Sequence, residues 1–174
     1  MPTGIIFQVQ LGLGYVVWLL GFGAYIWPWL KSLDRVAAQR VIAMLHSFRF
    51  FGLALIVPGV VSPNLPASFG PFAAYGDFAT GILAILALLT VRVRSLFWLF
   101  VAGFNLVGPA DIILDYYHAS LAGLPAEAGL LGATYAIPII YVPLLMITHI
   151  AALVLLVRPQ AETDPALATD RAVS

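Results

Sequence analysis

Long, uninterrupted apolar runs alternate with short polar connections along most of the chain. Five runs have the roughly 20 residues that a helix needs to cross a bilayer core, and they cover residues 5–30, 41–61, 71–91, 96–116 and 130–157. The apolar positions are continuous rather than alternating, which is unlike the strands of membrane barrels. The pattern therefore predicts an all-α fold, a polytopic bundle of five transmembrane helices in which residues 1–157 form one domain.

Composition supports this interpretation. Hydrophobic residues make up 62% of the 174 positions and charged residues only 9%, whereas about a quarter of a soluble domain is charged. We therefore expect the lipid bilayer to be the main partner. The basic residues are scattered, so no nucleic-acid surface is expected, and the lack of cysteine excludes disulfides and thiolate metal sites.

The basic residues predict an orientation. Residues 31–40 contain three of the eight Lys and Arg and residues 92–95 contain two, whereas residues 62–70 and 118–129 contain none. Since basic connections stay on the cytoplasmic side, we expect the N-terminus outside and the C-terminus inside. The polar segment 158–174 is expected to be a disordered cytoplasmic tail.

Several polar side chains interrupt the apolar runs. A charge inside a membrane is costly and usually faces the bundle interior and a partner, so we expect Arg49 to pair with Asp77 or Asp111. The leading hypothesis is a non-enzymatic membrane protein whose buried polar network binds or passes a small ligand or a proton. The residues of this network are His46, Arg49, Asp77, Asn105, Asp111 and His149.

Prolines cluster in the half of the bundle expected to face outward. Proline inside a helix removes a backbone donor and kinks the helix, and the freed carbonyls need partners that lipid does not supply. Together with three acidic residues in the same half, they predict a polar cavity that opens outward. The prolines are Pro58, Pro109, Pro138 and Pro143, and the acids are Asp77, Asp111 and Asp115.

The first alternative is a single b-type haem. His46 and His149 lie on different runs at a similar depth, and two neutral imidazoles on facing helices can serve as axial ligands. Arg49 could then hold a haem propionate.

The second alternative is an intramembrane lipid-modifying enzyme that binds a divalent metal. Asp111, Asp115 and His118 are spaced i, i+4 and i+7, so they share one helix face, and such side chains suit divalent cations. The second Asp-rich motif of prenyltransferases and phosphatidyl-alcohol transferases is missing from the chain. An acidic helix end that meets water explains the same residues.

Two glycines of the first run predict a close helix contact. Gly14 and Gly21 are seven residues apart and so lie on one face, where a lack of side chains lets another helix approach. The partner helix is expected either within the bundle or in a second copy of the chain.

Two stretches carry a resemblance. "RFFGLALIVPGVVSPNLPASFGPFAAYGDFATG" and "IPIIYVPLLMITHIAAL" resemble a pattern in small, uncharacterised five-span bacterial integral membrane proteins. In that pattern a His–x–x–Arg span leads to a Leu–Pro turn and a Gly–Asp pair, and a late span contains two prolines and a histidine. The resemblance implies a bacterial inner membrane setting and draws attention to His46, Arg49, Asp77 and His149, without implying an activity.

Overall fold

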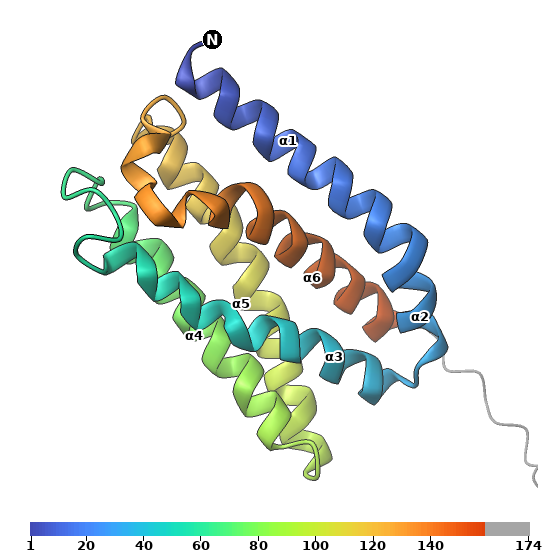
Figure 1. The fold of residues 1–174 in the computed structure, drawn as a ribbon. Helices are drawn as coiled ribbons and strands as arrows, with labels where there is room; N and C mark the ends of the chain where they lie inside the picture. Colours follow the sequence, from blue (N-terminus) through green and yellow to red (C-terminus); the bar gives the residue numbers. More distant parts are fainter. Residues whose placement is uncertain (159–174) are drawn as a thin grey trace, which may run out of the picture.

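The computed structural model describes residues 1–158 of the chain, and these fold into a bundle of helices without a β-strand (Figure 1). The predicted tail lies, from residue 159 onward, outside the described residues. The elements are α1 (Thr3–Gly21), the π-helical η1 (Phe22–Ile26), α2 (Trp27–Ser32), α3 (Arg35–Ser47), the 3₁₀ segment η2 (Phe48–Ile56), α4 (Gly70–Leu89), α5 (Arg94–Leu121), the 3₁₀ segment η3 (Ala128–Tyr135), the π-helical η4 (Ile137–Tyr141) and α6 (Val142–Val157).

These elements join into five helices that are long and apolar enough to cross a membrane. They are Thr3–Ser32, Arg35–Ile56, α4, α5 and Ile137–Val157. The first two combine α1 with η1 and α2, and α3 with η2, while the fifth combines η4 with α6. The described part of the chain thus has the predicted number of helices of membrane-spanning length.

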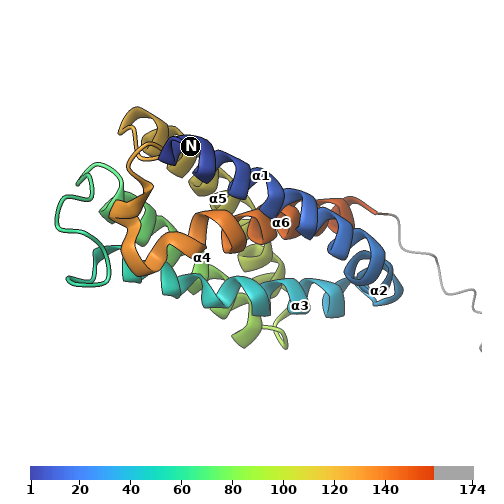
Figure 2. The same cartoon turned by 45° about the horizontal axis from the view of Figure 1, so that its top comes forward.

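The bundle has two distinct ends, which Figures 1 and 2 show from two directions. The N-terminus, the loop after η2 and the segment after α5 lie at one end, which we call the loop end. The turn between α2 and α3, the turn between α4 and α5, and the end of α6 lie at the other, which we call the basic end. The latter carries Lys31, Arg35, Arg40, Arg92, Arg94 and Arg158.

Four helix boundaries differ from the sequence prediction by five residues or more. The second helix begins at Arg35 rather than 41, and the fourth ends at Leu121 rather than 116. The second helix ends at Ile56 rather than 61, so Pro58 lies in the turn that follows it and kinks no helix. The fifth helix begins at Ile137 rather than 130, because Gly132 has φ 54° and ψ −128°, which no helix contains. A Cβ at Gly132 would overlap the Val60 carbonyl oxygen, so glycine lets η3 close against the loop after η2.

Local chemistry explains where several helices begin and end. The Asp34 side chain caps α3 by accepting a hydrogen bond from the Ala37 N–H at 2.9 Å. Pro71 occupies the first turn of α4, where the missing N–H costs nothing. Pro143 directly follows the π-helical η4 within the continuous helix Ile137–Val157. Pro109 lies inside α5, as the sequence predicted for a kinked helix.

Two apolar clusters fill the bundle, and the polar residues predicted to form the network are buried with them. The basic-end core joins small and aromatic side chains that include Ala84, Ala87, Phe97, Val101 and Ala152. The loop-end core is smaller and includes Phe7, Leu55, Phe69, Ala73 and Leu131. The polar residues are therefore surrounded by protein rather than facing the bundle exterior.

Helix α1 covers the bundle with one face and exposes an apolar surface on the other. Leu13, Val17 and Leu20 are more than half exposed. Gly14 packs against η4, where a Cβ would overlap the Ile139 carbonyl oxygen, whereas Gly21 has no described atom within 4 Å of its Cβ position. The predicted Gly14/Gly21 face is therefore not one interface: Gly14 finds its partner within the bundle, and Gly21 does not.

Candidate functional site

Arg49 lies at the centre of the polar network, in the first turn of η2. Its side chain is fully buried, with 0% exposure. Nε donates to Asp77 Oδ1 on α4 at 2.6 Å, and Nη2 donates to Asp111 Oδ2 on α5 at 2.6 Å. Charge-assisted bonds of this length are among the stronger hydrogen bonds in proteins. Arg49 therefore contacts both carboxylates that the sequence named as alternative partners.

The network continues from Arg49 to α6. The Arg49 Nη1 atom lies 3.3 Å from His149 Nε2, and His149 Nδ1 lies 3.0 Å from Asn105 Oδ1. A guanidinium only donates, so Nε2 accepts and Nδ1–H donates to the amide oxygen. The Asn105 amide in turn donates to the Val101 carbonyl at 2.9 Å, which orients the amide and fixes His149 as the neutral Nδ1–H tautomer.

His46 lies beside this chain and makes a separate contact. Its Nε2 is 3.0 Å from Thr148 Oγ1, whose hydroxyl donates to the Leu144 carbonyl at 2.9 Å. Since the hydroxyl proton is used there, His46 Nε2–H is the donor, and its Nδ1 is an acceptor. This Nδ1 is buried without a hydrogen-bond partner among residues 1–158.

The two histidines do not fit the predicted haem. Their ring centroids are only 3.9 Å apart, with an angle of 37° between the planes, so the rings are in van der Waals contact. Axial ligation places the macrocycle between the imidazoles, and no such space exists here. His149 Nε2 also already accepts from Arg49. The prediction that His46 and His149 lie at a similar depth was thus correct, but position along the two helices did not show that the rings are in contact.

Three glycines form the walls of the network. A Cβ at Gly76 would overlap the Asp111 carboxylate, one at Gly52 would overlap Asp77, and one at Gly108 would overlap the His149 ring. Each glycine lies on a different helix, and each lets a neighbouring helix bring its polar side chain close. The sequence patterns "YGD" in α4 and "VGP" in α5 could have indicated these close contacts, because each places a glycine next to an aspartate or a proline.

The motif Asp111, Asp115 and His118 does not form the predicted metal site. Among residues 1–158, no three His, Asp or Glu side chains are grouped to hold a metal ion. Asp111 points to Arg49, and His118 packs against Phe72 with ring centroids 4.5 Å apart. Asp115 Oδ1 is buried without a hydrogen-bond partner in the described part of the chain.

A cavity of about 170 Å³ lies in the loop-end half and reaches the network. Asp77 and Asp115 contribute to its lining, and Phe7, Phe69 and Tyr116 contribute aromatic walls. Gln8 and Ser120 also line it and are exposed residues near the ends of α1 and α5. The cavity lies in the half of the bundle where the sequence predicted a polar cavity, but apolar side chains make up most of its lining, and Asp77 and Asp115 are its carboxylates.

The acidic residues outnumber their basic partner at this site. Arg49 pairs with Asp77 and Asp111 within 4 Å, and Asp115, one helical turn after Asp111, lines the same cavity as Asp77. When all four groups are ionised, the site carries two more negative than positive charges. Excess charge in a buried site is relieved by binding a proton or a cation.

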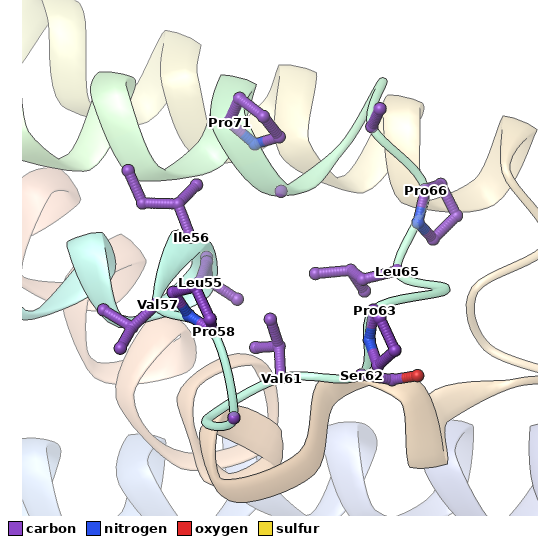
Figure 3. A pocket seen from close by; sticks show the side chains of 13 residues that line it. Leu55, Ile56, Val57, Pro58, Val61, Ser62, Pro63, Leu65, Pro66 and Pro71 are labelled. Atoms are coloured by element: carbon purple, nitrogen blue, oxygen red, sulfur yellow. The ribbon is translucent and has the colours of Figure 1, made fainter.

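A second hollow, of about 530 Å³, lies between the loop after η2 and the start of α4 (Figure 3). Pro58, Pro63, Pro66 and Pro71 stand around it together with aliphatic side chains. Its lining has no charged side chain among the described residues, so the chemistry of the molecule is concentrated at the Arg49 network instead.

The fold and the site define a helical bundle with five helices of membrane-spanning length and a buried Arg–Asp–His network. The chain belongs to the family described as Domain of unknown function (DUF8737), which matches residues 6–157. That description carries no activity, as the resemblance to uncharacterised proteins implied. No curated protein and no solved structure matches the chain.

Proposed function

We propose that the chain is an integral protein of a bacterial inner membrane, with five spans, the loop end outside and the basic end inside. The five apolar helices and the exposed aliphatic surface of α1 support insertion. Six of the eight basic residues lie at or near one end, which the positive-inside rule assigns to the cytoplasm. Reporter fusions after residues 36, 66, 93, 122 and 170 should report in, out, in, out and in, and a C-terminal reporter outside would contradict this topology.

The function that the geometry supports best is reversible proton binding at Asp115, beside the Arg49 network, with protons exchanged through the loop-end cavity. One observation carries this proposal: Asp115 Oδ1 is buried without a partner at a cavity wall. Asp77 and Asp111 are held by Arg49, so Asp115 is the carboxyl group that is free to gain and lose a proton. Ionisable groups inside a membrane mark such relays.

Anion binding at the buried arginine fits the site poorly. Arg49 has 0% exposure, and it donates to Asp77, Asp111 and His149. An anion would have to displace a carboxylate to reach it. The charge balance therefore favours a proton or a positively charged ligand.

Infrared spectroscopy of the full chain in lipid nanodiscs tests the proposal. A protonated carboxyl has a C=O stretch that an ionised one lacks, so a pH titration should show a carboxyl band that disappears as the pH rises. Asp115→Asn should remove this band, whereas Glu127→Gln, which changes an exposed acid at the same end, should leave it. A titration that is unchanged by Asp115→Asn would overturn the proposal.

A further inference from the structure

The lining of the loop-end cavity combines two features that together point to a ligand. Its walls are mostly apolar and include the rings of Phe7, Phe69 and Tyr116, while its polar side presents the carboxyl groups of Asp77 and Asp115. Among the described residues, no basic side chain lines it. An aromatic wall next to a carboxylate attracts a cation with apolar substituents, since ring faces and carboxylates are both negative.

We propose that this cavity binds a small primary ammonium ion that carries an apolar group. The ammonium lies against Asp115, and the apolar group packs against the aromatic wall. This inference rests on the proposed function, because the same Asp115 must lose its proton before the ammonium binds. Ammonium binding therefore releases a proton from the protein, and the two ligands compete.

The donor and acceptor pattern favours an ammonium over a metal ion. An ammonium has three N–H donors and no acceptor, and the cavity offers acceptors on Asp115, Asp77 and Gln8. Ser120 adds its hydroxyl oxygen, because its proton is donated to the Tyr116 carbonyl at 2.7 Å. A divalent metal needs several hard ligands in a compact shell, and residues 1–158 contain no such group.

The volume of the cavity limits the size of the ligand. At about 170 Å³ it is smaller than the roughly 300–1,000 Å³ of pockets for drug-sized molecules. It therefore suits an ammonium with a few carbon atoms or a single ring. An ammonium of this kind can come from a free amine outside the membrane or from a phosphatidylethanolamine headgroup in the outer leaflet.

Calorimetric titration of the full chain in phosphatidylglycerol nanodiscs tests the free-amine source. The probes are butylammonium and benzylammonium, with 1-butanol, benzyl alcohol and benzoate as neutral and anionic counterparts. We expect only the ammonium ions to bind and to release protons into a weak buffer. Asp115→Asn should weaken binding by about tenfold or more, because it removes a charge-assisted bond, while Glu127→Gln should leave the affinity within about twofold.

A second variant separates the ligand from the proton. Ala119 lines the cavity, so Ala119→Leu should fill space and abolish ammonium binding. The equilibrium infrared titration of Asp115 should still be observed, because a proton needs no free volume and slower exchange does not change the equilibrium. Ammonium binding equal to that of the alcohols in the parent chain, or unchanged in both Asp115→Asn and Ala119→Leu, would overturn the ammonium inference. If the infrared titration remains in that case, the proposed proton binding stands by itself.

Nanodiscs that contain phosphatidylethanolamine test the lipid source. If the headgroup is the ligand, this lipid should raise the melting temperature of the parent chain but not of Asp115→Asn, and it should compete with benzylammonium. If neither the lipid nor the soluble amines bind in a way that depends on Asp115, the cavity is not an ammonium site.

Discussion

The two halves of the bundle pack differently, and the Arg49 network lies at their boundary. In the basic-end half, side chains such as Ala84, Ala87 and Phe97 are fully buried at 0% exposure. In the loop-end half, 3₁₀ segments and prolines interrupt the α-helices, and a cavity lined by Asp77 and Asp115 reaches the network. From this difference we expect the network to be reached from the loop end, because the cavity there contacts its carboxylate Asp77 and the neighbouring Asp115.

Removing Arg49 should have the largest effect. Arg49→Leu leaves Asp77 and Asp111 buried without their partner, and breaking a buried pair from one side costs about 3–5 kcal/mol of unfolding free energy in soluble proteins. Membrane couplings are smaller, at about 0.6 kcal/mol on average, so several lost bonds must add up. Thermal unfolding in detergent should show a marked loss for Arg49→Leu and little for Arg40→Leu, an exposed arginine on the same span.

Adding Asp77→Asn or Asp111→Asn to Arg49→Leu should recover part of this loss, because each removes one unpaired charge. If Arg49→Leu has the same melting temperature as the parent chain, the ion pairs of Arg49 do not stabilise the boundary between the two halves.

The glycine contacts should come next. In Gly76→Ala the new Cβ would overlap Asp111, so α4 and α5 must separate or the carboxylate must leave Arg49. Overpacking of this kind costs about 1–3 kcal/mol. Gly12→Ala is the matched control, since no described atom lies within 4 Å of its Cβ position. Equal melting of the two variants would argue against the close approach.

Replacing one alanine by leucine in each half should change the unfolding free energy less than the substitutions above, and it compares the packing of the two halves directly. Ala84→Leu adds three carbons where exposure is 0% and should cost about 1–3 kcal/mol. Ala119→Leu adds the same carbons next to the cavity and should cost less than Ala84→Leu, because the cavity accommodates them. Denaturation of both variants in one detergent provides the measurement, and a larger loss for Ala119→Leu would reverse the assignment of packed and open halves.

The number of long apolar helices was predictable because it depends on composition and run length. The boundaries near 56 and 137 were less so. Hydropathy continues past Ile56 and begins before Ile137, whereas the structure depends on a 3₁₀ segment and on the positive φ of Gly132. These are backbone features that an apolar run does not record.

The candidate site was predictable in its members but not in its geometry. Because a charge within an apolar run needs a partner of opposite charge, the sequence predicted that Arg49 pairs with Asp77 or Asp111. Depth along each helix did not reveal that His46 touches His149, or that Asp115 turns to a cavity rather than to a metal. Lateral positions depend on how helices rotate and approach, and here Gly52, Gly76 and Gly108 set that approach.

Cysteine labelling in intact cells tests the central claim, which is one-sided access to the network. The chain has no cysteine, so Ala119→Cys and Ala84→Cys each introduce a single thiol, one at the cavity and one in the basic-end core. A membrane-impermeant thiol reagent that carries an ammonium group should modify the cysteine at 119 from outside and leave the cysteine at 84 unmodified. Equal modification of both, or modification at 119 only after the cells are opened, would contradict the account.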